Sequence, residues 1–545
     1  MTGGTSTRSY AQAIDALNGL QSNAAVIDAI RKSGGKGGDV QLKEQLEYMQ
    51  RIGYSPTDLN RMNVLHITGT KGKGSTSAFV SSLLTTLAPK AKVGLYTSPH
   101  MVAVRERIRI NGDPIPEDMF ARYFWEVWDK LEADQKRADP VTPEKPAYFR
   151  YLTIMAMHVF LQERVDATVL EVGVGGTYDS TNIVPQPITT GVTALGIDHI
   201  WVLGKTLPEI AHQKGGIYKP GVPALAIKQD EGLDVLEARA KELKASSFTV
   251  VPEHPQFKDI KLGLAGVHQR SNASLAVALV RSFLASDRCP SAFCAASSAT
   301  NDNTSTSGSL ESADPNSLPA LPTGLVAPNP LPEPYVAALE RTRWPGRCQL
   351  SPDPKDARIK WYLDGAHTVE SLKCCGEWFA EEALARCARF PQSAERVLIF
   401  NCTSGRSGLS LLGALTSSLS PPDGSNSANK QQSQPFKHVI FCTNTTFASG
   451  SSKGDLTSNA VDAKDLETLA TQRELAAAWE ELAANVDTNG AAALKANVHV
   501  LGSIEEAMDV VRKEAAQESV REVQALVTGS LHLVGGAMAV ADLPL

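Results

Sequence analysis

The sequence predicts an α/β protein with two domains, each built around a mainly parallel sheet. Short apolar segments alternate with segments of helical length along most of the 545 residues, and this alternation is typical of parallel strands joined by helices. It occurs in two series, separated by residues 286–330, which are rich in Ser, Ala, Asn, Thr and Pro. A segment of that composition cannot bury enough apolar surface to offset its ordering entropy. We therefore expect domains at residues 1–290 and 333–545, with a low-complexity linker or insertion at 291–332.

The first series begins with a strand at residues 64–68, a glycine-rich turn and a helix at 75–88. Further strands of this series are expected at 92–97, 167–172 and 191–197. The second series is expected to contain strands at 359–363, 396–400, 438–442, 498–501 and 523–528 and helices at 369–390, 463–484 and 504–515. Low-complexity stretches at 417–435 and 448–460 are expected to be surface loops. Ligands of parallel sheets bind beyond the carboxyl ends of the strands, so the residues that follow these strands are the first candidates for a site.

Composition restricts the class of protein. Apolar residues make up 42% and charged residues 21% of the chain, as in an ordinary soluble globular protein. The net charge of −6 argues against general nucleic-acid binding, which needs a basic surface. No apolar run reaches the roughly 18 residues of a membrane-spanning helix, and the eight cysteines include no Cys-x-x-Cys pair. We expect no integral membrane segment, reduced thiols and a cytoplasmic location, with a mitochondrial form started upstream left open.

A glycine-rich turn between the first strand and the first helix has the composition of a phosphate-binding loop. Glycines let the backbone wrap around a phosphate, and the following helix offers N–H groups and the positive end of its dipole. Lys73 would reach the β- and γ-phosphates of a nucleotide. The spacing departs from the strict P-loop pattern, so a flexible basic turn is the alternative, but the strand–turn–helix context favours a nucleotide site. The turn consists of Gly69, Thr70, Lys71, Gly72, Lys73, Gly74 and Ser75.

Acidic and basic residues follow two further predicted strands. Glu171 ends one of them and precedes a glycine-rich segment that contains Asp179; a carboxylate beside a phosphate-binding loop suits Mg²⁺. A Rossmann glycine pattern would need a glycine in place of Tyr178, so dinucleotide binding is not supported. His199 follows the next strand, and Lys214 stands near the end of a short helix. For each of these side chains taken alone, a solvated or structurally paired residue is the alternative.

The second domain offers a further group of polar residues at strand ends. Arg347 follows the linker, and a guanidinium group binds phosphate oxygens well. Asp364 and His367 follow a strand directly, and Ser530 follows the last strand. Taken alone this group is a weak indicator, because an arginine in a loop is most often solvated.

In this order the motifs resemble the folylpolyglutamate synthase family, a branch of the Mur ligase superfamily. The resemblance runs from near residue 40 to the C-terminus and is weakest in the low-complexity segments. Several motifs are weak individually, but their order along the chain is highly specific. They are HITGTKGKGSTSAF, LYTSPHMVAVRERIRING, YFRYLTIMAMHVF, LEVGVGGTYDSTNIV, GIDHIWVLGKTLPEIAHQKGGIYKPGVP, GVHQRSNASLA, RWPGRCQ, WYLDGAHTVES and VTGSLHLVGG.

The resemblance implies a P-loop-containing, Mur ligase-type central domain with a mainly parallel sheet, followed by a Rossmann-like α/β C-terminal domain. It implies an enzyme that uses ATP to attach L-glutamate to the γ-carboxylate of tetrahydrofolates through an acyl phosphate, with ADP and phosphate as products. Mg²⁺ is the implied metal, and a monovalent cation such as K⁺ is an additional candidate. The protein is expected to act as a monomer.

The resemblance also implies residue roles. Residues 69–75 would hold the ATP phosphates, with Lys73 supporting the γ-phosphate. Further nucleotide contacts would be Asn272, Arg347 and Asp364, and the Mg²⁺ ligand positions would be Ser98, Glu171 and His199.

The resemblance also assigns residues to the chemical step and to the binding of the substrates. Lys73 would be catalytic together with Lys214, which matches a lysine that is carbamylated in related ligases. His367 and Ser530 fall in segments tied to the incoming glutamate, and His367 would also take part in the chemical step. Residues 97–104 match a mobile loop near the folate site.

Three alternatives remain open from the sequence. Dihydrofolate synthase, or an enzyme with both activities, is the nearest, since it adds the first glutamate to dihydropteroate on the same fold. A P-loop ATPase or kinase that acts as a switch would need no second α/β domain, and its ATP cleavage would not depend on glutamate. A catalytically inactive binding protein would have no reason to keep Lys73, Glu171, His199 and Arg347 together.

Overall fold

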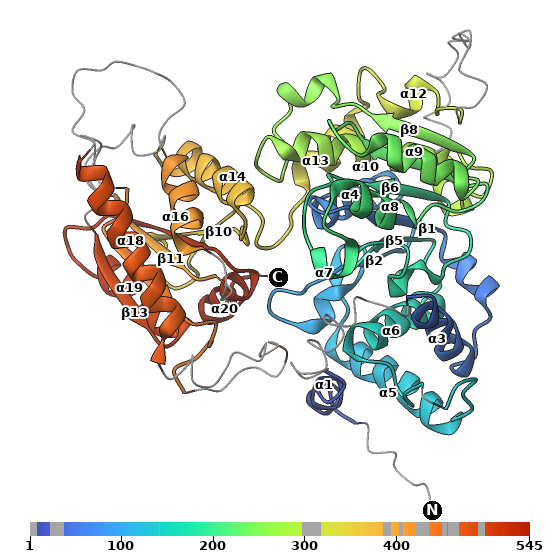
Figure 1. Cartoon of the computed structure of the whole chain (residues 1–545), viewed down its shortest axis with the longest axis horizontal. Coiled ribbons are helices and arrows are strands. Elements are labelled where there is room, and N and C mark those ends of the chain that lie inside the picture. The colour runs from blue at the N-terminus through green and yellow to red at the C-terminus, as the bar shows by residue number, and fades with distance from the viewer. Residues whose placement is uncertain are drawn as a thin grey trace, which may run out of the picture. The chain divides into compact units, whose positions relative to one another are not determined.

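Two compact units make up the computed structural model of the chain (Figure 1). Unit 1 lies within residues 1–100, 105–263 and 268–343, and unit 2 within residues 101–104, 264–267 and 344–545. The structure describes residues 8–21, 38–140, 142–296, 318–384, 394–402, 407–419, 435–449, 455, 468–488 and 496–544. Within these ranges, no helix combines the length and the apolar character needed to cross a membrane.

The division between the units follows Arg343. Two helices that come after the predicted limit at residue 290, α12 (Thr323–Val326) and α13 (Glu333–Arg341), are elements of unit 1. Residues 297–317, the larger part of the predicted linker, lie outside the described residues. The domain limits at 290 and 333 therefore stay a prediction.

Unit 1 contains an eight-stranded sheet in the order β4-β3-β2-β5-β1-β6-β7-β8. The strands from β2 to β8 in this order run parallel to their neighbours, whereas β3 and β4 are antiparallel additions at one edge. Every residue of β1 and β5 is buried, as expected for central strands covered on both faces. The strands are β1 (Val64–Thr68), β2 (Val93–Tyr96), β3 (Ile108–Ile110), β4 (Asp113–Pro114), β5 (Ala167–Glu171), β6 (Thr189–Val192), β7 (Pro223–Ile227) and β8 (Ser247–Val251).

Helices cover both faces of this sheet. Leu279 of α10 fills the space beside Gly191, whereas the next residue, Val192, packs with residues of α8 and α9. Successive strand residues point to opposite faces, so α10 lies on one face and α8 and α9 on the other. The helices of unit 1 besides α12 and α13 are α1 (Tyr10–Asn18), α3 (Gly38–Arg51), α4 (Lys73–Leu87), α5 (Glu117–Ala133), α6 (Tyr148–Gln162), α7 (Ile200–Leu203), α8 (Leu207–Gly215), α9 (Leu233–Glu242) and α10 (His268–Leu284).

Unit 2 contains a six-stranded sheet in the order β13-β12-β11-β14-β10-β9, parallel except for β9. Successive residues of its strands again face opposite sides of the sheet. Trp361 packs in the cluster with α19 and α20, and Tyr362 packs in the cluster with α14, α16 and α18. The strands are β9 (Gln349–Pro352), β10 (Ile359–Leu363), β11 (Ala394–Phe400), β12 (His438–Cys442), β13 (Asn497–Leu501) and β14 (Glu522–Thr528). The helices are α14 (Val369–Phe379), α16 (Gly408–Ser417), α18 (Ala470–Thr488), α19 (Ile504–Ala515) and α20 (Leu531–Ala541).

Short 3₁₀ segments complete the described elements. They are η1 (Pro56–Met62), η2 (Val104–Arg107), η3 (Ser180–Ile183), η4 (Pro255–Lys258) and η5 (Ser291–Phe293).

The predicted fold class is confirmed, and so are most of the predicted elements; β10, β12 and α19 have the predicted bounds. The strand predicted at 191–197 is wrong. It ends at Val192 because the carbonyl of Ala194 accepts hydrogen bonds from the N–H groups of Thr70 and Lys71, at 2.8 and 3.1 Å. The N–H of Thr193 still donates to Thr68 O of β1 at 2.8 Å, and at Ala194 the chain pairs with the glycine-rich turn instead.

The helix predicted at 369–390 changes from α- to π-helical within the residues that the structure describes. α14 ends at Phe379 and continues as one π-helical turn, Ala380–Leu384, after which the described residues stop. The predicted loops at 417–435 and 448–460 lie for the most part outside the described residues.

Candidate active site

The glycine-rich turn leaves β1 and opens α4, as the sequence predicted, and its shape is fixed from two sides. The hydroxyl of Thr193 donates to Lys71 O at 2.6 Å, next to the two bonds from the turn to Ala194. Gly72, with a φ of +87°, is the N-cap of α4, and a Cβ there would collide with Asn272 Oδ1. The turn is thus held from two sides, and it leads directly into α4, whose first N–H groups have no acceptor within the helix. This is the geometry that binds phosphate.

Two lysines converge on one carbonyl oxygen of this turn. Lys73 Nζ donates to Gly69 O at 2.9 Å, and Lys214 Nζ, from the last turn of α8, donates to the same oxygen at 2.8 Å. Lys214 is 3% exposed, and burial together with the charge of Lys73 lowers its pKa to about 7. The two amines lie together beside the turn, and the lowered pKa of Lys214 gives this lysine a neutral fraction near pH 7.

Asn272 reaches the turn from α10. Its amide donates to Gln269 Oε1 at 2.9 Å, and Gln269 Nε2 donates to the hydroxyl of Ser75 at 3.2 Å. The structure therefore brings the predicted nucleotide residue Asn272 against Gly72 and Ser75. Gln269 was missed in the sequence because a glutamine in a helix gives no distinctive signal.

Of the three predicted metal positions, two lie in direct contact with each other. Glu171 ends β5 and is 3% exposed, and the backbone N–H of Ser98 donates to its Oε2 at 3.4 Å. His199 precedes α7, its side chain is 52% exposed, and its pKa is lowered by burial and by the nearby charges of Lys73 and Lys214. Glu171 and Ser98 are thus neighbours, and His199 stands within electrostatic reach of the lysine pair.

The donor set has the chemistry of a weak, open Mg²⁺ site. One carboxylate and one hydroxyl are hard oxygen donors, and Mg²⁺ usually takes few protein ligands and completes its shell with water and phosphate oxygens. Across the part of the chain that the structure describes, no three His, Cys, Asp or Glu side chains are grouped so as to hold a metal by themselves. The residues present therefore fit a Mg²⁺ ion that arrives with a nucleotide, and not a resident ion in a complete protein cage.

In unit 2, Asp364 organises the predicted residues. Its two carboxylate oxygens accept hydrogen bonds from the N–H of Cys348 at 2.7 Å and of Ala366 at 2.8 Å. A Cβ on Gly365 would meet Arg347 Nη1, so Arg347 lies against the turn that follows β10. His367 donates from Nδ1 to Gly365 O at 2.8 Å. The structure thus brings Arg347, Asp364 and His367 together.

Ser530 stands at the end of β14, the strand next to β10. It is the N-cap of α20, and its hydroxyl accepts from the N–H of Leu533 at 3.5 Å. This bond gives Ser530 a structural role in addition to the predicted one.

Unit 1 holds a pocket that the sequence did not reveal. Its cavity volume is about 190 Å³, and two aromatic rings, a buried carboxylate and several apolar side chains form its walls. Arg150 in one wall is held by α3: its guanidinium donates to Gln41 O and Glu44 at 2.7 Å and to Gln45 at 3.1 Å. The lining residues are Gln41, Phe149, Arg150, Val174, Gly175, Gly176, Tyr178, Asp179, Ser180, Val202, Leu203 and Gln213.

This pocket adjoins the phosphate-binding turn. Thr68, the last residue of β1, donates its hydroxyl hydrogen to the carbonyl of the lining residue Gly175 at 2.5 Å, and Gln213 precedes Lys214. Of the residues that the sequence singled out, Asp179 is the one in its wall.

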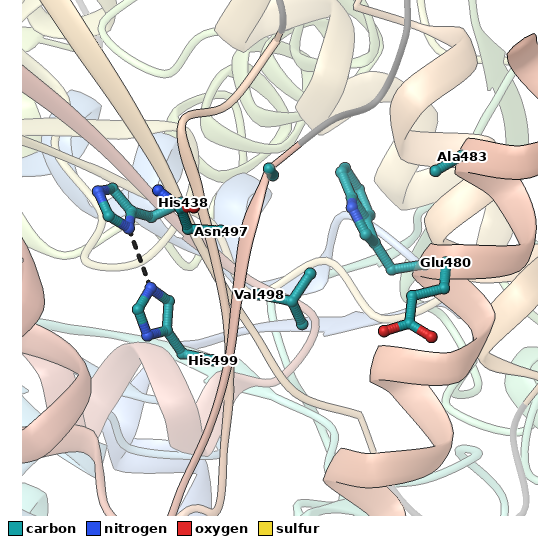
Figure 2. Close-up of a pocket in the computed structure, with 8 residues that line it drawn as sticks. His438, Glu480, Ala483, Asn497, Val498 and His499 are labelled. Atoms are coloured by element: carbon teal, nitrogen blue, oxygen red, sulfur yellow. Dashed lines mark hydrogen bonds between the residues drawn. The ribbon is translucent and has the colours of Figure 1, made fainter.

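A larger cavity, of about 680 Å³, lies at the edge strand of unit 2. Figure 2 shows His438 of β12 hydrogen-bonded to His499 of β13, at 3.0 Å between Nδ1 and Nε2. It contains none of the predicted site residues, so we do not assign it to the chemistry. The lining residues are His438, Trp479, Glu480, Ala483, Ala496, Asn497, Val498 and His499.

A phosphate-binding turn with a strand-end carboxylate and a buried lysine, followed by a second α/β unit, defines a Mur ligase-type enzyme. Two curated relatives span nearly the whole chain. Folylpolyglutamate synthase of Neurospora crassa is 40% identical over 99% of this chain and 92% of its own length, and that of Saccharomyces cerevisiae is 41% identical over 98% and 87%. The chain belongs to the folylpolyglutamate synthase family. A scan against models of protein families gives no match.

Solved structures agree on the fold. Folylpolyglutamate synthase of Mycobacterium tuberculosis complexed with ADP is 20% identical, with a TM-score of 0.62 over 98% of each chain. The Escherichia coli FolC protein in complex with DHPP and ADP is 21% identical, with a TM-score of 0.55 over 91% of this chain and 93% of that one. At such identities the likeness supports the fold alone.

Proposed function

We propose that this chain attaches L-glutamate to the γ-carboxylate of tetrahydrofolates, with ATP cleaved to ADP and phosphate. The observation that carries the proposal is the match to folylpolyglutamate synthases over almost the full chain. The glycine-rich turn and the two lysines that meet on it in this chain support the proposal. The finer assignments below rest on the geometry of that site.

The reaction needs an activated carboxylate. A carboxylate is a poor electrophile, because its leaving group would be oxide. Transfer of the γ-phosphoryl group of ATP makes an acyl phosphate, which the amine of glutamate attacks to give the amide and phosphate. Such a transfer depends on positioned positive charge more than on a nucleophilic side chain. The amine of Lys73, together with the N-terminal N–H groups of α4, supplies that charge in unit 1.

Ser98, Glu171 and His199 would hold Mg²⁺ with the phosphates of ATP. When bound, the ion neutralises charge on the phosphate oxygens. Arg347 and Asp364 would contact the nucleotide from unit 2. His367 and Ser530 would contact the incoming glutamate, and K⁺ stays an additional candidate.

The pocket of unit 1 would take the ring system of the folate. Pockets for flat heterocycles combine aromatic walls with a few fixed polar groups. Phe149 and Tyr178 provide the rings, and Gln41, Arg150 and Asp179 provide polar groups at the edges. From this pocket the glutamate tail of the folate would extend toward the lysine pair.

The test is an assay of the purified protein with ATP, Mg²⁺, L-glutamate and tetrahydrofolate, followed by measurement of ADP and of product mass. We expect ADP formation that needs both the folate and glutamate, with products heavier by one or more glutamyl residues. Equal ADP formation without glutamate would contradict the ligase and favour the ATPase alternative.

Dihydrofolate synthase is the second candidate, because it uses the same fold and phosphate chemistry. Replacing tetrahydrofolate by dihydropteroate in the same assay separates the activities. Product with both substrates would mean a bifunctional enzyme, and product with dihydropteroate alone would displace our proposal. A monomeric state and a cytoplasmic or mitochondrial location stay predictions.

A further inference from the structure

A chain of hydrogen bonds runs from the centre of the unit 1 sheet to the wall of the pocket. His66, in the middle of β1, is completely buried, and its Nε2 lies 2.9 Å from the hydroxyl oxygen of Thr181. That hydroxyl is 2.6 Å from Asp179 Oδ1. Nothing in the proposed reaction uses His66 directly, so its burial needs another explanation.

The donors in this chain can be assigned. Asp179 Oδ1 also accepts from the N–H of Thr181 at 2.9 Å, so it acts as the acceptor for the Thr181 hydroxyl. A hydroxyl has one hydrogen to give, and Thr181 gives it to the carboxylate. His66 must then donate from Nε2–H to the hydroxyl oxygen. Burial and the charge of Lys219 lower the pKa of His66 to about 3, so the imidazole is neutral and is held in one tautomer.

Asp179, at the end of this chain, shapes the pocket wall. Its Oδ2 accepts from the N–H of Val174 at 3.0 Å, and it is the N-cap of η3. These bonds close the loop of residues 174–179 on itself. Most residues of that loop line the pocket, so the orientation of this carboxylate helps to fix one wall, together with the bond from the Thr68 hydroxyl to Gly175 O.

The opposite end of the loop is fixed independently. The Asn182 amide donates to the carbonyls of Thr177 and Gly216, each at 3.0 Å, and Lys219 donates to Asn182 O at 3.0 Å. Those bonds tie the loop to the end of α8. Two ties join the loop to β1: the bond from the Thr68 hydroxyl to Gly175 O, and the chain from His66, which reaches the loop through the Asp179 side chain.

We propose that His66 is a positioning residue for the folate pocket: by donating to Thr181 it orients Asp179 and so fixes the wall formed by residues 174–179. An apolar residue at position 66 would leave the Thr181 hydroxyl without its donor and weaken its bond to the carboxylate, because hydrogen bonds in a chain polarise one another. The inference rests on the proposed function, since it takes the pocket as the site of the folate ring.

The experiment compares variants that keep the donor with variants that lose it. His66→Leu removes the N–H and Thr181→Val removes the hydroxyl, whereas His66→Gln and Thr181→Ser keep a donor and a hydroxyl. Each is assayed with tetrahydrofolate varied at saturating ATP and glutamate, and then with ATP varied. We expect His66→Leu and Thr181→Val to raise the KM for folate about tenfold, the cost of one unsatisfied buried group. The kcat and the KM for ATP should stay near wild type, and the donor-keeping variants should recover most of the folate KM.

A matched control is His254→Leu. His254 is also in unit 1 and 1% exposed, and it is hydrogen-bonded through Nε2 to Pro328 O at 2.6 Å. Loss of this buried imidazole should leave the folate KM unchanged even if the melting temperature falls. If His66→Leu does not fold, Thr181→Val, which keeps the side-chain shape, carries the test.

The outcomes separate the inference from the proposed function. An unchanged folate KM in Thr181→Val, or equal rises of the KM for folate and for ATP, would overturn the role of His66 while leaving the ligase intact. A wild-type protein without any folate- and glutamate-dependent ADP formation would overturn the proposed function, and the inference would fall with it.

Discussion

In both units, predicted site residues lie near the carboxyl ends of central strands. The interactions that hold these side chains differ between the two units. In unit 1 the groups are buried ionisable side chains: Lys214 and Glu171 are each 3% exposed, and burial lowers the pKa of Lys214 to about 7. In unit 2 the groups are held by backbone bonds, as Asp364 is by the N–H groups of Cys348 and Ala366.

This difference indicates a division of labour. Ionisable groups with strongly shifted pKa values gather where chemistry occurs, and groups anchored by the backbone give fixed geometry for binding. Changes in unit 1 should therefore lower kcat, and changes in unit 2 should mainly raise KM values and reduce stability. The predictions below test this contrast, beginning with the largest expected effect.

Lys73→Ala should give the largest loss. The side chain donates to Gly69 O beside the proposed γ-phosphate position, and removal of one group that stabilises transition-state charge commonly costs about 10²–10³-fold in kcat. The measurement is kcat from glutamate-dependent ADP formation at saturating substrates. Lys241→Ala, which removes an exposed lysine of unit 1 that pairs with Glu237, is the control and should be near wild type. A normal kcat in Lys73→Ala would contradict a role of unit 1 in the chemical step.

Lys214→Ala should lower kcat about 10–100-fold, the usual cost of losing a group that orients metal or phosphate ligands. We expect Lys214 to work as a carbamate: its neutral amine adds carbon dioxide, an N–C bond forms, one proton is released, and the neutral amine becomes an anion. A pKa of about 7 provides the neutral amine that this step needs. Acetate should then partly restore the activity of Lys214→Ala. An active variant that is indifferent to bicarbonate would end this idea without touching the ligase assignment.

The same lysine should give stability a characteristic pH dependence. Between pH 7 and its ordinary pKa of 10.5, Lys214 binds a proton in the unfolded chain but not in the folded one, so stability rises with pH across this window. Below pH 7 the folded protein carries the full cost of the buried charge. Lys214→Met should therefore unfold at a higher denaturant concentration than wild type at pH 6, and the advantage should shrink toward pH 10. A difference in unfolding midpoint between Lys214→Met and wild type that does not change with pH would mean that Lys214 is not desolvated in solution.

The sequence predicted the parts of both sites that are local in the chain. Strand ends, glycines and charged residues within a few positions of one another revealed the turn at 69–75 and the Asp364 group, and β10 and α19 were predicted with their observed bounds. The pocket was missed because its walls come from distant segments: Gln41 and Arg150, which form one wall together, are 109 residues apart. The predicted end of the strand at 191–197 was wrong for the same reason, because at Ala194 the chain pairs with the distant glycine-rich turn and not with a strand.

Asp364→Ala tests unit 2. It removes the acceptor of two backbone N–H groups, and hydrogen bonds to a charged group contribute about 1.5–3 kcal/mol each. We expect a lower melting temperature and a KM for ATP raised about tenfold, because the turn with Arg347 loses its anchor, while kcat changes less than in Lys73→Ala. Asp356→Ala is the control, since Asp356 pairs with Arg358 at the exposed surface of the same unit. A large loss of kcat with unchanged KM would contradict the division of labour.

His199→Ala should have the smallest effect, and it sharpens the comparison within unit 1. The side chain is 52% exposed, so its loss should hardly change stability. Mg²⁺ prefers oxygen ligands and keeps several waters, so a water can replace the imidazole, whereas Glu171 supplies the hard carboxylate oxygen. We therefore expect the Mg²⁺ concentration for half-maximal rate to rise a few-fold in His199→Ala and much more in Glu171→Gln, with kcat largely recovered at saturating Mg²⁺ in the first variant only.

Mn²⁺, which accepts imidazole more readily, should support the wild type well, and the difference in rate between wild type and His199→Ala should be larger with Mn²⁺ than with Mg²⁺. Identical Mg²⁺ titrations in both variants would show that these residues do not hold the metal, and the buried charge of Glu171 would then need a structural explanation.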